Sequence, residues 1–154
     1  MSGALQAVFQ NQRSFGFPPG QEAYLASGTF TFTVPAGVTE INAVCVGGGG
    51  GGGSEWQSYF DEGGAGGGGG ALAYSNGISV TPGETLTITV AAAAPGGQSP
   101  NTSGTVGGSS SVQRGGTTLV EAVGGGRGRF VGGRGQGGSA AACTGDVKYS
   151  GGDG

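Results

Sequence analysis

A short insert between two glycine runs holds the side chains best suited to binding. The runs cover 47–53 and 63–70, and the insert between them carries the only tryptophan of the chain. Aromatic rings stack on sugar C–H groups and anchor protein interfaces, and carboxylates accept hydrogen bonds from hydroxyls. Two interpretations follow: the insert contacts a receptor, or its aromatic side chains plug a neighbouring subunit. The candidate contact residues are Glu55, Trp56, Tyr59, Phe60 and Asp61.

Arginines near the C-terminus stand in a pattern that is typical of RNA-binding segments. Arg127-Gly128-Arg129-Phe130 and Gly133-Arg134-Gly135 alternate arginine with glycine. Such segments bind RNA by stacking and charge, but six basic residues against nine acidic ones give this chain a net charge of −3. We therefore expect no nucleic-acid partner. Instead, the planar five-donor guanidinium groups are expected to donate hydrogen bonds to glycine carbonyls.

Catalytic and metal-binding patterns are absent from the sequence. There is no histidine, which removes the commonest general base and the commonest zinc ligand. Lys148 is the only lysine and lies in no phosphate-binding motif, and Asp146 and Asp153 lack the spacing of a calcium loop. We expect no enzyme activity, no cofactor and no metal.

Glycine dominates the composition and limits how these side chains can be positioned. It accounts for 41 of 154 residues, and each costs roughly 0.5–1 kcal/mol more to order than alanine. The glycine segments therefore either stay disordered or recover this free energy through close backbone packing. Polyproline II segments pack side by side where no side chain intervenes, so we expect this conformation for 47–53, 63–70 and 124–138.

Alternating apolar and polar residues predict short strands. The ranges are 29–34, 40–46, 71–74 with an extension at 78–80, 85–90, 110–112 and 117–123. No segment has a helical period. We expect an all-β fold: a small β-sandwich of about six or seven short strands, with long polyproline II-like glycine loops and an extended N-terminal arm. The expected inward residues are Phe30, Phe32, Val34, Ile41, Val44, Val46, Leu72, Ile78, Val80, Leu86, Ile88, Val90, Leu119 and Val123.

Three parts are expected along the chain: an arm at 1–26, the sandwich at 27–123 and a glycine-rich segment at 124–154. Cys45 and Cys143 lie among apolar or small residues, and we expect two buried free thiols rather than a bridge. The N-terminus lacks the basic and apolar regions of a secretory signal, and no stretch is apolar enough to span a membrane. We expect synthesis in the cytosol and no membrane insertion.

The order of the pieces resembles a known family. FTVPAGVT is followed by a glycine run, then by SVTPGETLTITV and by SGTVGGSSSVQRGGTTLVEAVGGGRG. Over about 27–140 this resembles the glycine-rich domain of phage tail fibres and tail-tip adhesins. LQAVFQNQRSFGFPPG is similar to the start of short glycine-rich virion proteins of cyanobacterial phages.

The resemblance implies a virion protein of the tail or fibre that is usually a homotrimer. Its implied partners are other tail proteins and host surface carbohydrate or an outer-membrane protein. A structural virion adaptor or decoration protein without a receptor site is the alternative. Because fibres attach by their N-termini, the arm is expected to dock to the virion, with local packing on the sandwich as its alternative. Its candidate docking residues are Leu5, Val8, Phe9, Arg13, Phe15 and Phe17.

Overall fold

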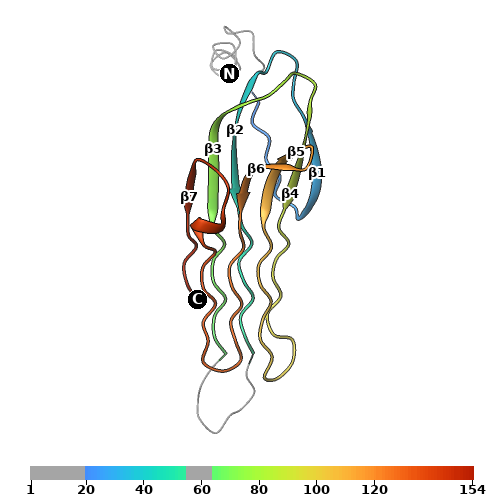
Figure 1. The fold of residues 1–154 in the computed structure, drawn as a ribbon. Coiled ribbons are helices and arrows are strands. Elements are labelled where there is room, and N and C mark those ends of the chain that lie inside the picture. The colour runs from blue at the N-terminus through green and yellow to red at the C-terminus, as the bar shows by residue number, and fades with distance from the viewer. Residues whose placement is uncertain (1–19, 55–63) are drawn as a thin grey trace, which may run out of the picture.

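The computed structural model describes residues 20–54 and 64–154, which form two antiparallel sheets that continue into a bundle of glycine segments (Figure 1). One sheet has the strand order β1-β4-β5-β6 and the other β2-β3-β7. The fold is therefore all-β, as the alternation predicted. The strands are β1 (Gly28–Thr33), β2 (Glu40–Val46), β3 (Leu72–Ser79), β4 (Thr85–Val90), β5 (Ser110–Arg114), β6 (Thr117–Ala122) and β7 (Val147–Tyr149).

The predicted strand ranges agree closely with these bounds. β2 and β4 match theirs residue for residue, and β3 joins the predicted strand 71–74 to its extension at 78–80. β7 and the short 3-10 helix η1 (Ala140–Ala142) have no counterpart in the sequence prediction. β7 pairs with β3, so residues of the expected segment 124–154 complete the second sheet.

The core lies between the two sheets, where β5 and β6 pack against β2 and β3. Its largest fully buried side chains are Val34, Leu86 and Val120. Cys45 and Cys143 are both free and buried, as expected. Burial raises the pKa of the Cys45 thiol from 9.0 to about 11, and the nearby carboxylate of Glu121 adds to the shift.

The expected inward set was wrong at two positions of β2. Val44 and Val46 are 65% and 58% exposed, and Cys45 points into the core between them. The alternation along β2 is unbroken, because the irregularity in the pairing of β2 with β3 lies on β3. The odd-numbered residues of β2 from Ile41 onward therefore all face inward. Phe30, Leu72 and Val90 are only half-buried, and the other expected residues lie in the core or pack against it.

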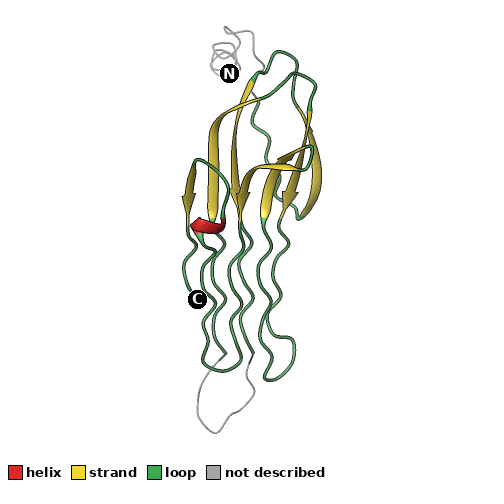
Figure 2. Ribbon diagram, viewed as in Figure 1, coloured by secondary structure: helices red, strands yellow, loops and turns green. Residues whose placement is uncertain are grey.

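Below the strands, the glycine segments run side by side without ladder pairing (Figure 2). The N–H groups of Gly47, Gly50 and Gly53 donate to segment 64–71 over 2.8 Å each. The N–H groups one residue further along, beginning with that of Gly48, donate to segment 102–108. Hydrogen bonds that recur at every third residue match the three-residue turn of polyproline II. This supports the predicted conformation of these segments.

The glycine bundle has two layers. The front layer consists of 150–154, 64–71 and 47–54, which continue β7, β3 and β2, and of 91–98, which lies against 47–54. The back layer consists of 102–109, 123–129 and 133–139. Hydrogen bonds run both within and between the layers, so nearly every segment has neighbours on several sides. One chain alone thus supplies the close packing that the glycine content requires.

The bundle accepts only glycine at its inner positions. A Cβ on Gly47 or Gly50 would lie 2.0 Å from the carbonyl oxygen of Val123 or Gly126, respectively. The corresponding distance from Gly51 to the carbonyl oxygen of Pro95 is 2.1 Å. No carbon atom approaches an oxygen so closely without displacing it. The glycine runs are therefore a packing requirement of the interior and not flexible linkers.

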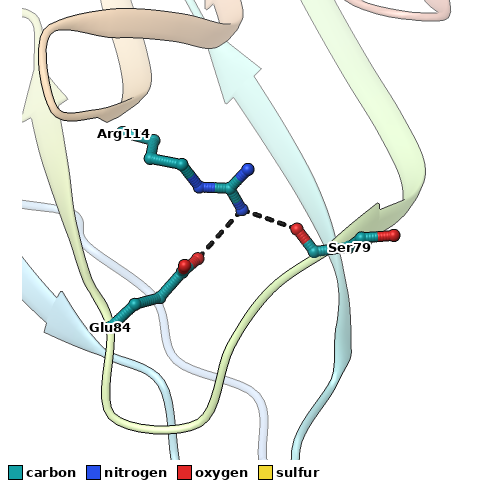
Figure 3. A network of polar contacts seen from close by, with 3 residues as sticks. All are labelled: Ser79, Glu84 and Arg114. Carbon is teal, nitrogen blue, oxygen red and sulfur yellow. Dashed lines mark hydrogen bonds and ion pairs between the residues drawn. The ribbon is translucent and has the colours of Figure 1, made fainter.

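One ion pair fixes the end of the sandwich that lies away from the bundle (Figure 3). The Nη2 of Arg114, at the end of β5, lies 2.9 Å from Oε1 of Glu84 and 2.6 Å from the carbonyl oxygen of Ser79. The guanidinium group thus joins β5 to the turn between β3 and β4. It holds the two sheets together at this edge.

Candidate functional site

Two described connections meet at the far end of the bundle, away from the strands (Figure 1). They are the loop 97–102 and the turn 129–133, and Ser54 and Gly64, the described residues that flank the insert, lie at the same end. Polyproline II segments on either side hold each connection in place through hydrogen bonds. The bundle therefore acts as a rigid support that presents these connections together.

Ser54 joins the start of the insert to the loop 97–102. Its N–H donates to the carbonyl oxygen of Thr102 over 2.8 Å, and its hydroxyl donates to the carbonyl oxygen of Ser99. Within the loop, the Thr102 hydroxyl donates to Ser99 over 2.7 Å. Asn101 adopts a φ of 58°, a conformation that asparagine tolerates better than most residues. Hydrogen bonds within the loop, and those that Ser54 donates to it, thus hold the loop closed.

The turn 129–133 presents apolar side chains beside the residues that follow the insert. The Arg129 N–H donates to the carbonyl oxygen of Gly133 over 2.8 Å, and Gly132 takes a φ of 57° that closes the turn. Phe130 is 39% exposed and Val131 is 57% exposed. The return of the insert is adjacent, because the N–H of Ala65 donates to the carbonyl oxygen of Arg129. An aromatic ring and an aliphatic side chain are therefore available for contact at the tip.

The contact residues predicted for the insert lie outside the described residues, and so does the range 55–63 as a whole. Both ends of the insert are described. The Gly53 N–H donates to the carbonyl oxygen of Ala65 over 2.8 Å, so the chain leaves and re-enters the bundle at neighbouring positions. The described residues on either side of the insert thus lie at the tip. The predicted residues concerned are Glu55, Trp56, Tyr59, Phe60 and Asp61.

An open groove follows the side of the tip. Arg134 and Asp153 supply its charges, and glycine and alanine backbone from 64–66, Gly132 and Gly154 supply the rest of its lining. Oδ1 of Asp153 accepts a hydrogen bond from the N–H of Gly137 over 2.7 Å, which fixes one of these charges. The groove is shallow and polar. It suits contact with a surface rather than enclosure of a small molecule.

The expected role of the arginines was wrong. Arg127, Arg129 and Arg134 are exposed, and within 20–54 and 64–154 their guanidinium groups donate to no glycine carbonyl. The three side chains extend into solvent near the tip instead.

The predicted docking residues of the arm, from Leu5 to Phe17, also lie outside the described residues. The described part of the arm packs on the sandwich. The ring of Tyr24 lies 5.2 Å from that of Phe30 in a tilted arrangement. The described part of the arm, which precedes β1 along the chain, therefore contacts β1. The docking residues are Leu5, Val8, Phe9, Arg13, Phe15 and Phe17.

Two general features of the described part of the chain bear on function. Among residues 20–54 and 64–154, no three histidine, cysteine or acidic side chains gather into a group that could hold a metal ion. The same residues contain no helix that could cross a membrane. The tip offers apolar contact from Phe130 and Val131, and charge from the arginines and Asp153.

Sequence reasoning singled out the insert and the arginines around the turn 129–133, but it did not single out the loop 97–102. Gln98-Ser99-Pro100-Asn101 has the composition of a turn, which was the available signal. Nothing local indicated that this loop lies next to Ser54, because that contact depends on the three-residue period of the bundle.

The comparisons with known proteins identify the family. A search of curated proteins found no match. A family model described as a glycine-rich domain matches residues 25–154, which include every strand and every segment of the bundle. The chain belongs to this glycine-rich domain family.

Proposed function

We propose that this chain is a phage virion protein of the tail or fibre that contributes to attachment at the host surface. The observation that supports the proposal is the position of the two residues that flank the insert. These residues lie at the tip of a rigid bundle, beside the exposed Phe130 and Val131. A stiff support that ends in aromatic and polar loops suits contact with a large surface. The sequence resemblance to phage tail-fibre domains supports the viral context.

Weak contact at each tip is sufficient for this role. The groove and the exposed tip residues offer a small contact area, so a single copy is expected to bind weakly. Several copies on one particle bind together, and linked sites raise the overall affinity by orders of magnitude. The bundle supports this effect because it holds the loops in a fixed orientation.

A structural role in the virion without a receptor site is the second candidate. The exposed apolar residues of the β2–β3–β7 sheet favour it, since Val44 and Val46 are available for contact with another protein. Under this alternative the aromatic residues of the insert plug a neighbouring subunit. The N-terminal arm is proposed to dock to the virion under both candidates.

The deciding experiment is a competition for adsorption of phage particles to host cells. Purified wild-type protein, supplied at up to about 1 mM because a single copy binds weakly, is expected to reduce particle adsorption, and Trp56→Ala is expected to lose this effect. Val106→Ala is the matched control, because Val106 is 61% exposed on the side of the bundle and away from the tip. Failure of the wild-type protein to compete would refute the attachment role and leave the structural one.

The docking role of the arm has its own experiment. Particles are assembled with a chain that lacks residues 1–17, and incorporation is measured by immunoblotting of purified virions. Loss of incorporation is expected. Normal incorporation would contradict docking through the arm while leaving the adsorption result unaffected.

A further inference from the structure

An apolar patch covers the outer face of the β2–β3–β7 sheet. The strand register sets Val44 opposite Tyr74 and Tyr74 opposite Val147, with a second row directly beside the first. Val44, Val46 and Tyr149 are 58–65% exposed, and the other members are half-buried. We call this patch the apolar half; its members are Val44, Val46, Leu72, Tyr74, Val147 and Tyr149.

The same face continues along the front layer of the bundle as bare backbone. With a three-residue period, the position after the outward Val46 is Gly49, and the position after the outward Tyr149 is Gly152. Both glycines are exposed. We call this part the glycine half; its members are Gly49, Gly52, Gly66, Gly69 and Gly152.

The fold of the single chain does not require glycine at the two most open of these positions. A Cβ on Gly49 would lie 3.7 Å from its nearest heavy atom, and one on Gly152 would meet nothing within 4 Å. The outward positions of the back layer do carry side chains, among them Val106, Arg127 and Gln136. The absence of a side chain at Gly49 and Gly152 therefore needs another explanation.

The face is complementary to itself in shape. Its apolar half is raised by side chains, and its glycine half is recessed. A copy turned end over end places its raised half above the recessed half of the first copy, and the reverse contact forms at the same time. This is the geometry of a two-fold interface, in which the same patch serves both partners.

We propose that two copies of this chain pair through this face, with the apolar half of each lying on the glycine half of the other. A side chain at Gly49 or Gly152 would fill the space that the partner's valine, leucine and tyrosine side chains occupy. This proposal adds to the proposed function the surface through which copies associate. It rests on the proposed function only for the virion context in which pairing would occur.

Charge and hydrogen bonding agree with a second copy as the occupant. Neither half contains a charged residue, so two identical faces meet without repulsion although each chain carries a net charge of −3. The N–H groups of Gly49 and Gly152 donate to no acceptor within 20–54 and 64–154, and both are exposed. They remain available to carbonyl groups of the partner's backbone.

The size of the face sets the strength to expect. From Val44 to Gly52 it extends about 25 Å, given rises of about 3.3 Å per strand residue and 3.1 Å per polyproline II residue. Three chains about 5 Å apart make it roughly 15 Å wide with side chains, so the pair covers on the order of 800 Å² in total. Interfaces at this low end of the range are weak. The measurement must therefore span micromolar to millimolar concentrations.

The experiment is sedimentation equilibrium of the full chain from about 1 µM to 1 mM. The wild-type protein is expected to pass from a one-chain to a two-chain mass across this range. Val44→Thr with Val46→Thr keeps the branched shape that strands favour but makes the apolar half polar. Gly49→Val with Gly152→Val fills the glycine half. Each double variant is expected to weaken pairing at least tenfold.

Val106→Thr is the control, since it makes the same chemical change at an exposed valine of the back layer. It is expected to pair as the wild type does. Circular dichroism of each variant at low concentration establishes that the single chain is folded, and a variant that fails this check is replaced by Tyr149→Ser.

Three results would overturn the proposal: a one-chain mass at all concentrations, a three-chain mass, or wild-type pairing by both double variants. A three-chain mass would agree with the homotrimer that the family resemblance implies. None of these results bears on the adsorption competition, so pairing and attachment can fail independently.

Discussion

Gly49 and Gly50 are neighbours in one glycine run, yet the bundle predicts opposite responses to alanine. A Cβ on Gly50 would lie 2.0 Å from the carbonyl oxygen of Gly126, whereas one on Gly49 has 3.7 Å of space. A normal carbon–oxygen contact exceeds 3 Å, so Gly50→Ala must move segment 47–54 away from 123–129 by more than 1 Å. Gly49→Ala requires no movement.

The expected magnitudes follow from the contacts that this movement breaks. Segments 47–54 and 123–129 share the hydrogen bonds Gly125 N–H to Gly48 O and Gly128 N–H to Gly51 O, both 2.9 Å. Losing them costs about 0.5–1.5 kcal/mol each, and overpacking adds about 1–3 kcal/mol. We expect Gly50→Ala to lower the free energy of unfolding by about 2–6 kcal/mol. Gly49→Ala should raise it by about 0.4–1 kcal/mol, because alanine restricts the unfolded chain.

Urea denaturation followed by circular dichroism measures both variants. The protein is kept on the order of 1 µM so that pairing does not contribute. With a slope of about 1–3 kcal/mol per molar urea, Gly50→Ala should shift the midpoint downward by roughly 1–3 M. Equal effects of the two substitutions would refute the close packing of the bundle, because a flexible glycine linker would not distinguish adjacent residues.

Three further predictions concern the sandwich. Leu86→Ala removes a fully buried side chain and should lower the free energy of unfolding by about 2–5 kcal/mol, measured by urea denaturation; a loss below about 1 kcal/mol would contradict its central position. Arg114→Met removes the ion pair with Glu84 and should cost about 0.5–1 kcal/mol, with the difference from wild type shrinking in 1 M salt, since the Arg114 side chain is 40% exposed. The raised pKa of Cys45 means that the folded state favours the neutral thiol. The contribution of this thiol to the free energy of unfolding is therefore complete below pH 9 and is lost as the pH rises toward about 11. Between these pH values the free energy of unfolding, measured by thermal unfolding, should fall by about 2–3 kcal/mol less in Cys45→Ala than in the wild type. An equal fall in both proteins would refute the raised pKa of Cys45.

The strands could be predicted from the sequence because their signal is local. Alternating threonine with phenylalanine, leucine or isoleucine in 29–34 and 85–90 identifies β1 and β4. β7 carries no such signal: Val147-Lys148-Tyr149 is too short to show a period, and it becomes a strand only because the edge of β3 is free to pair with it. Propensity does not reveal a strand that depends on a partner already in place.

The side of β2 that faces inward was harder to predict for a different reason. Hydrophobicity favours Val44 and Val46 over Ala43 and Cys45, but the alternation that begins at the inward Ile41 places Ala43 and Cys45 on the core side. At the tip, composition indicated the insert, while its contact with the loop 97–102 depends on the hydrogen bonds of Ser54. Long-range contacts of this kind carry no sequence signature.

The three-residue period of the hydrogen bonds also has a consequence for how such bundles change in length during evolution. An insertion of one or two residues in a glycine segment would rotate all following positions, so inner glycines would exchange places with outward residues. An insertion of three restores every position. Three residues matched in the neighbouring segments would lengthen the bundle by about 9 Å and leave its faces unaltered. Relatives of different length are therefore expected to differ by multiples of three in each segment, with the distance between sandwich and tip set in steps.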